Sequence, residues 1–221
     1  VQPHDTLQAK AVTLDPMSWI DSSIRYQTYK PLVETFDGTV ASNWVDPPTG
    51  GANLVYTISG GTNTKLEHGD TTIVVNGQSQ QVGTPNSVEF APQSFSSVSL
   101  GQKFTIGQVT YFNGSTFNQS DATSGELRLT INFTNPSLTM VIDVPFDFVS
   151  TPNSNDPYAS ADKIVMTQTS FGLPQAINGV NYQLRLNFAT VTSGGFGTAT
   201  AVNAFEGGQA IADMEGTLVA Q

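Results

Sequence analysis

The stretch "ELRLTINF", residues 126–133, carries the pattern on which the fold prediction depends. Apolar residues alternate in it with polar ones, at Leu127, Leu129, Ile131 and Phe133. Because successive side chains of a strand point to opposite sides of a sheet, this alternation gives one buried face and one wet face. The stretch "NYQLRLNF", residues 181–188, repeats the pattern with Tyr182, Leu184, Leu186 and Phe188 inward. Each stretch therefore predicts a strand that is covered on one side.

Further runs rich in β-branched and aromatic residues predict more strands. They are "LVYTI" (54–58), "TTIVV" (71–75), "SVEFA" (87–91), "KFTIGQVTYF" (103–112), "TMVIDVPFDFV" (139–149), "DKIVMT" (162–167) and "AIADMEGTLVA" (210–220). Clusters of Gly, Asn and Pro separate the runs, and Asn178-Gly179 predicts a type I′ hairpin turn because both residues accept positive φ. We therefore predict an all-β fold, a two-sheet antiparallel β-sandwich with jelly-roll-like connections.

Composition limits the kinds of protein that this chain can be. With 221 residues, of which 38% are hydrophobic, it is long enough for one all-β domain. Eighteen acidic residues against eight basic ones give a net charge of -10, which repels nucleic acid and anionic membranes. Cysteine is absent, so neither disulfides nor thiolate metal sites exist. No apolar run reaches the ~18 residues that a membrane span requires.

The beginning of the sequence bears on where the protein works. The first residue is Val1, and no leader with a charged and then an apolar part precedes it. We interpret the chain as a mature exported protein whose signal peptide has been removed, although a chain cleaved from a tag would begin in the same way. The predicted location is therefore extracellular or at the cell surface.

Few residues offer catalytic chemistry. The two histidines, His4 and His68, lie near the chain start and in a predicted loop, "LEHGD", which favours structural roles for both. Asp143 and Asp147 can lie on one face of a strand, as a pair of hydrolase carboxylates would, but a solvated strand face has the same pattern. We therefore predict that the protein is not an enzyme.

The stretch "STPNSNDPYASADKI", residues 150–164, offers the best candidate for a cation site. Calcium prefers six to eight oxygen ligands from carboxylates, amides and carbonyls. The candidate ligands are Asn153, Asn155, Asp156, Ser160 and Asp162. The same side chains can also tie a loop together by hydrogen bonds to its own backbone, so a calcium site and a plain loop both stay open.

Several segments together resemble the choice-of-anchor K domain of bacterial exported proteins. They are "SLGQKFTIGQVTYFNGSTF", "LRLTINFTNP", "VSTPNSNDPYASADKIVM", "INGVNYQLRLNF" and "AVNAFEGGQAIADMEGTLV", with a weaker match upstream in "FDGTVASNW" and "YTISGGTNTKLEHGD". The resemblance covers Phe36 to about Val219. It implies a β-sandwich at the cell surface with no established enzymatic role. The sequence stops at "GTLVAQ", so we expect an anchor either to have been removed or to be replaced by other means.

Residues 1–35 precede this region, so we divide the chain into an N-terminal extension, 1–35, and a β-sandwich, 36–221. The extension contains "TLQAKAVTL", residues 6–14, which predicts a strand that can complete a sheet of its own domain or of a neighbour. The candidate assembly residues are Leu7, Ala9, Ala11, Val12 and Leu14. Pairing with a neighbour would join copies head to tail, and a head-to-tail contact that does not close forms a fibre.

Two functions from different classes follow from these observations. The first is a non-enzymatic exported subunit of an extracellular filament, sheath or matrix, which assembles as a homo-oligomer or polymer through the N-terminal strand. The alternative is a monomeric carbohydrate-binding or adhesive surface domain. In it, exposed aromatic residues stack on sugar rings. The candidates are Trp44, Tyr111, Phe112 and Tyr158.

Overall fold

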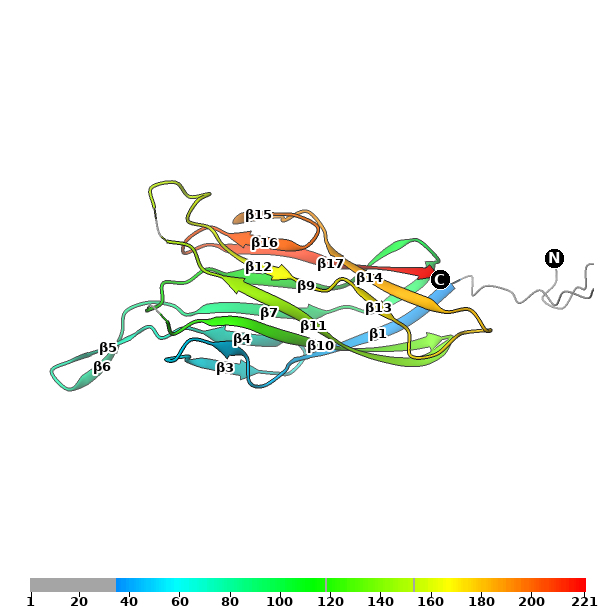
Figure 1. Cartoon of the computed structure of the whole chain (residues 1–221), viewed down its shortest axis with the longest axis horizontal. Helices are drawn as coiled ribbons and strands as arrows, with labels where there is room; N and C mark the ends of the chain where they lie inside the picture. The colour runs from blue at the N-terminus through cyan, green and yellow to red at the C-terminus, as the bar shows by residue number, and fades with distance from the viewer. Residues whose placement is uncertain (1–34, 118, 153) are drawn as a thin grey trace, which may run out of the picture.

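The computed structural model describes residues 35–117, 119–152 and 154–221. Within these ranges every regular element is a strand (Figure 1), and all strand pairs are antiparallel. Two large sheets pack against each other, which confirms the predicted all-β sandwich. None of the described residues belongs to a helix long and apolar enough to cross a membrane.

The first sheet contains the longest strands of the protein, β10 and β11. Its order is β15 (Gly195–Gly197), β16 (Ala201–Ala204), β12 (Asp162–Met166), β11 (Ser137–Val149), β10 (Ala122–Asn135), β1 (Thr35–Trp44) and β8 (Phe95–Ser99), with β2 (Thr49–Gly50) also beside β10. The second sheet has the order β13 (Ser170–Gly172), β14 (Tyr182–Phe188), β17 (Gln209–Ala220), β9 (Lys103–Phe112), β7 (Asn86–Pro92), β4 (Thr64–His68) and β3 (Tyr56–Ser59). The chain crosses repeatedly between the sheets, for example from β7 to β8 and back to β9.

The alternating residues of β10 and β14 point into the space between the two sheets. All eight side chains predicted to face inward are buried: Leu127, Leu129, Ile131, Phe133, Tyr182, Leu184, Leu186 and Phe188. Aromatic rings join the sheets directly, since Phe36 of β1 meets Tyr182 with 5.6 Å between ring centroids. Phe146 of β11 meets Phe188 in the same way at 6.3 Å. The alternation therefore predicted the core correctly.

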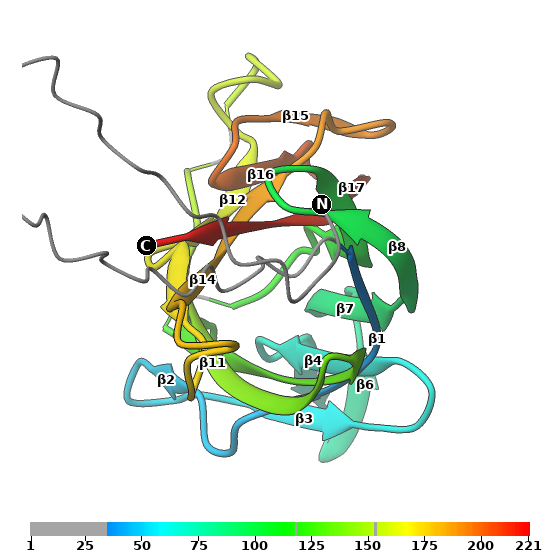
Figure 2. The same ribbon diagram turned by 90° about the vertical axis from the view of Figure 1, so that its right-hand side faces the viewer.

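Two Asn-Gly turns close hairpins. Asn178 and Gly179 have φ values of 52° and 75° between the bridged residues Ile177 and Val180, which confirms the predicted turn. Asn76 and Gly77, with φ values of 54° and 77°, connect β5 (Thr72–Val75) to β6 (Gln78–Gln81). These two strands form a separate small sheet that extends from one end of the sandwich (Figure 1), the end that lies away from the viewer in Figure 2.

Strand β1 was not among the predicted strands. Its sequence, "TFDGTVASNW", consists mostly of small and polar residues, so hydrophobic periodicity gives little signal there. Phe36 and Trp44 nevertheless anchor its two ends in the core. Gly38 lets the ring of Phe95 approach closely, because a Cβ at that position would lie 2.6 Å from the Phe95 Cζ. Tertiary packing thus determines this strand.

A methyl group added to β9 tests how tightly the core is packed. A Cβ at Gly107 would overlap the buried ring of Phe90 on β7. We expect Gly107→Ala to lower the free energy of unfolding by about 1–3 kcal/mol, because overpacking forces neighbouring atoms to move. Urea denaturation measures this loss. Gly172→Ala on β13 is the control, since its methyl group meets no atom within 4 Å, and an equal effect of both variants would contradict the packing.

Candidate functional site

The predicted calcium loop, residues 150–164, is held by its own hydrogen bonds. The Asp162 carboxylate accepts hydrogen bonds from the Thr151 N–H at 2.6 Å and from the Thr151 hydroxyl at 3.1 Å. Asp156 accepts one from the Tyr158 N–H at 2.9 Å. The Ser160 hydroxyl is buried and accepts the N–H of Ser154 at 2.7 Å. Asp156, Ser160 and Asp162 therefore all have partners within the protein.

The remaining predicted ligands, Asn153 and Asn155, do not add support for a calcium site. Asn155 is exposed, and Asn153 lies outside the described residues. Across the described ranges, no group of three or more His, Asp or Glu side chains is placed to hold a metal ion. Asp156 and Asp162 bind different parts of the loop instead of converging. The calcium site thus stays a prediction, and the hydrogen bonds account for the order of the loop without an ion.

An acidic pocket of about 290 Å³ lies beside this loop, at the end of the sandwich remote from the C-terminus. Three carboxylates line it together with hydroxyl groups. The lining side chains are Asp121, Asp162, Glu206, Ser115, Thr116 and Thr151. The loop that follows β9, the loop before β12 and the turn after β16 supply them. Three segments far apart in the sequence thus meet in one concave, negatively charged site.

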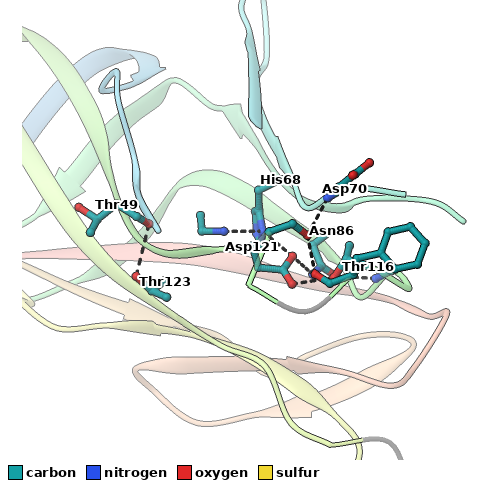
Figure 3. Close-up of polar contacts among 11 residues, drawn as sticks. Thr49, His68, Asp70, Asn86, Thr116, Asp121 and Thr123 are labelled. Carbon is teal, nitrogen blue, oxygen red and sulfur yellow. Dashed lines mark hydrogen bonds and ion pairs between the residues drawn. The ribbon is translucent and has the colours of Figure 1, made fainter. Parts of the chain in front are cut away.

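Asp121 is fixed by a network of hydrogen bonds (Figure 3). It accepts hydrogen bonds from Asn86 Nδ2 at 2.8 Å and from the Thr116 hydroxyl at 2.6 Å, and His68 Nδ1 lies 3.2 Å from its Oδ1. Burial by itself raises the pKa of Asp121, but the hydrogen bonds from His68, Thr116 and Asn86 outweigh it and keep the pKa below its usual value. Asp121 is therefore a charged acceptor with a fixed orientation.

His68 belongs to the framework of this site. It is the last residue of β4, so the predicted loop at "LEHGD" is wrong at this position. The sheet pairing of β4 with β7 extends to His68 and Asn86, which explains the strand. Its ring is buried and stacks on Phe148 with 5.1 Å between centroids. His68 thus connects the core to Asp121.

Asp162 has the opposite electrostatic setting from Asp121. Burial raises its pKa, and the nearby charges of Glu206 and Asp121 raise it further, while the hydrogen bonds from Thr151 act in the other direction. The net result is a carboxyl group that binds a proton more readily than an ordinary aspartate. The two aspartates of one pocket thus have pKa values shifted in opposite directions.

Tyr111 of β9 is a buried residue under the electrostatic influence of the pocket carboxylates. Burial raises its pKa well above the usual range, and the charges of Asp162, Asp121 and Glu206 add to the shift, so its phenol lies near all three carboxylates. The side chain is only 2% exposed, and its hydroxyl makes no hydrogen bond with another described residue. A buried hydroxyl normally finds a partner. The Tyr111 ring thus belongs to the core beneath this end of the sandwich and is not one of the residues that line the pocket.

An aromatic cluster lies next to the pocket. Tyr158 is 65% exposed, and its ring centroid lies 5.3 Å from those of Phe196 and Phe205. Phe205 directly precedes Glu206, which lines the pocket. Tyr158 was among the aromatic residues expected to bind a ligand, whereas Phe196 and Phe205 were not, because they lie in short segments without strand periodicity. Only the fold brings the three rings together.

The other aromatic residues predicted to stack on sugars do not face solvent. Trp44 and Tyr111 are buried, at 3% and 2% exposure, so the prediction of stacking surfaces there is wrong. Both point inward because they occupy core positions of β1 and β9. Phe112 is half-buried. Of the four predicted rings, Tyr158 is the one that is broadly exposed.

Asp143 and Asp147 lie on the outer face of β11, as predicted. Arg128 donates two hydrogen bonds of 2.7 Å to Asp143, and this contact lowers the pKa of Asp143. Asp147 instead lines a pocket of about 360 Å³ with Glu126. The aromatic residue of that pocket, Phe146, is 1% exposed and offers no ring face to a ligand. Asp143 therefore does not supply the acid of raised pKa that a pair of hydrolase carboxylates requires.

The predicted assembly residues cannot be placed in the structure. Leu7, Ala9, Ala11, Val12 and Leu14 lie outside the described residues, and so does His4. The roles assigned to them from the sequence remain predictions. The described chain begins at Thr35, the first residue of β1. The position of this residue fixes where the extension joins the sandwich.

The opposite pKa shifts in the pocket predict opposite effects of neutralising each aspartate. We expect Asp121→Asn to lower the free energy of unfolding at pH 7 by about 1–3 kcal/mol, because it removes the charged acceptor of the Asn86 amide and the Thr116 hydroxyl. A depressed pKa stabilises the fold above the unfolded-state value near 3.9, so this difference should shrink as the pH falls below about 4. Urea denaturation between pH 3 and pH 7 measures it.

Asp162→Asn should act in the other direction. A raised pKa means that the charged form disfavours the fold, so the variant should be more stable than the natural chain at pH 7. The advantage should fade as the pH falls and the natural Asp162 becomes protonated. The amide oxygen of the asparagine can still accept the Thr151 N–H. Parallel pH profiles for the two asparagine variants would contradict these assignments.

Chelation separates the two interpretations of the 150–164 loop. We expect Ser160→Ala to lower the free energy of unfolding by about 1 kcal/mol equally with and without a calcium chelator, because the hydroxyl acts through protein hydrogen bonds. Thermal unfolding measures this, with the exposed Ser137→Ala on β11 as the control. A chelator that lowers the melting temperature of the unmodified chain would instead support a bound calcium ion.

Comparison with known proteins assigns neither a family nor a function to this chain. The chain matches no model of a known protein family and no curated protein. The resemblance to the choice-of-anchor K domain therefore stays a prediction based on the quoted segments. Among the described residues, the acidic pocket and the aromatic cluster beside it are the features that bear most directly on function.

Proposed function

We propose that the protein is a carbohydrate-binding surface domain whose site is the acidic pocket together with the aromatic cluster of Tyr158, Phe196 and Phe205. One observation carries the proposal. A tyrosine ring that is 65% exposed is held by two other rings directly beside a pocket of fixed carboxylates and hydroxyls. Exposed rings gathered on a surface are typical of binding sites, since isolated domains usually bury them.

The two parts of the site match the two kinds of surface on a sugar. The C–H faces of a pyranose ring are apolar and pack against an aromatic face, which Tyr158 offers. The hydroxyl groups of the sugar donate hydrogen bonds, for which charged carboxylates are strong acceptors. Asp121 is a prepared acceptor because three neighbours fix its orientation. The hydroxyl groups of Ser115, Thr116 and Thr151 also line the pocket.

Charge and size limit the sugar. Three carboxylates in the pocket and a net charge of -10 repel uronates, sialates and sulfated sugars. The ligand is therefore a neutral sugar or an amino sugar. A volume of about 290 Å³ lies at the lower end of the range of ligand pockets and suits a single sugar unit. Longer chains would extend over the exposed ring of Tyr158.

The function is binding, and the place of action that we propose is the cell surface or the extracellular space. The composition of the chain, poor in charge and without cysteine, accords with an exported sandwich. The assembly function predicted for residues 1–35 depends on a segment outside the described residues.

A glycan array followed by calorimetry tests the proposal. We expect selective binding to neutral or amino sugars and none to sialylated or sulfated ones. Tyr158→Ala should weaken the best ligand about tenfold, because one aromatic contact contributes up to about 1.5 kcal/mol. Tyr56→Ala is the control, since this ring on β3 is also exposed, at 37%, but lies on the other sheet.

Two results would contradict the proposal. An array without selective binding would exclude a carbohydrate function for the pocket. Equal affinities of Tyr158→Ala and the unmodified chain would show that the aromatic cluster is not part of the site. Circular dichroism of each variant confirms that the sandwich has kept its fold, so a loss of binding can be assigned to the missing ring.

A further inference from the structure

The hairpin formed by β5 and β6, residues 71–83, projects from the end of the sandwich (Figures 1 and 2). Its two strands pair only with each other among the described residues. The Val82 N–H donates to the Thr71 carbonyl at 2.8 Å and continues the pairing inside the hairpin. At its base, Asp70 connects it to the body: the Asp70 carbonyl accepts the Phe117 N–H at 2.9 Å, and the Asp70 N–H donates to the Ser120 hydroxyl at 2.8 Å. The rest of the hairpin extends beyond the core.

Apolar side chains on this hairpin face solvent. Val74 is 73% exposed, Val75 is 40% exposed, and Val82 is 55% exposed. A two-stranded hairpin is marginally stable in water unless its face is covered. Three exposed valines on such an element therefore suggest a surface that is covered in the working state of the protein.

Both edges of the hairpin lack the usual protection against further strand pairing. Proteins commonly blunt free edges with lysine, proline or a bulge, because unpaired N–H and C=O groups accept another strand. The sequence of residues 71–83, "TTIVVNGQSQQVG", has no charged residue and no proline, and the pairing of β5 with β6 runs without a bulge. The hairpin is thus an open edge suited to an added strand.

The position of the hairpin indicates where that strand comes from. Thr35, the first described residue, lies at the opposite end of the long axis of the molecule (Figure 1). Residues 1–34 of the same copy therefore join the sandwich far from their own hairpin. A second copy stacked end to end brings its residues 1–34 directly to this hairpin. The geometry thus favours pairing between copies.

Charge favours the same occupant. Residues 35–221 contain fourteen acidic residues against five basic ones, so the bodies of two copies repel each other. Residues 1–34 contain four acidic and three basic residues and are nearly neutral. Their segment "TLQAKAVTL", residues 6–14, alternates small or apolar residues with polar ones, as an added strand requires. An uncharged edge and a nearly neutral strand can meet where two acidic bodies cannot.

We propose that the β5–β6 hairpin is the acceptor for residues 6–14 of a second copy of this chain, so that copies join head to tail by strand addition. Each copy offers one acceptor at one end and one donor strand at the other. Such a contact does not close on itself, and repetition extends the chain of copies. This inference does not rest on carbohydrate binding, which uses different residues.

Sedimentation velocity of the full chain over a range of concentrations tests the proposal. We expect the unmodified chain to form a concentration-dependent series of multimers. Val74→Lys should weaken association at least tenfold, because it places a charge on the open edge. Val141→Lys on β11 is the matched control, as Val141 is an exposed valine, at 56%, on the outer face of a central strand. This variant should assemble like the unmodified chain.

A synthetic peptide of residues 1–15 provides a second measurement on the full chain. Excess peptide should occupy the hairpins and lower the average mass of the multimers. Three results would each overturn the proposal: a full chain that stays monomeric at every concentration, equal assembly of the two lysine variants, or a peptide without effect. Circular dichroism confirms that Val74→Lys remains folded, and unchanged sugar binding by this variant keeps the two proposals separate.

Discussion

The contact between the inner faces of the two sheets is the interaction on which the rest of the structure depends. Aromatic rings from opposite sheets meet along it, such as Phe95 of β8 and Phe104 of β9 with 4.5 Å between centroids. Because the chain has no cysteine, disulfides do not hold the sheets together. Burial of these rings therefore supplies most of the favourable free energy of folding, and every long strand must place its apolar side chains on this one face.

The same core also positions the pocket. His68 stacks on Phe148 at the end of the core, and its Nδ1 reaches Asp121. Nε2 of this histidine is buried and has no hydrogen-bond partner among the described residues. Such an unsatisfied group costs free energy, so the ring is retained there by its packing and by its contact with Asp121. The acidic pocket is thus an extension of the core and not merely a feature of surface loops.

Hydrophobic periodicity predicted the parts of the fold that this packing dictates. The alternation in β10 and β14 identified the inward side chains correctly, and the Asn178-Gly179 turn followed from backbone chemistry. Strand β1 was not predicted, because a sequence of mostly small and polar residues becomes a strand only through its neighbours. The pocket escaped for a related reason, since Asp121 and Glu206 are 85 positions apart and only the fold makes them neighbours. The local sequence around either residue does not reveal that the two side chains line one pocket.

The excess of negative charge leaves few places on this protein where another copy or an anionic ligand can make contact. A body with fourteen acidic and five basic residues repels other copies and anionic ligands alike at low salt. In the pocket, the carboxylates of Asp121, Asp162 and Glu206 concentrate this negative charge, which disfavours entry of an anionic ligand. The hairpin lies at the same end but carries no charge, so it escapes the repulsion that protects the remaining surface. The two proposals, sugar binding in the pocket and association at the hairpin, are therefore both compatible with one acidic surface.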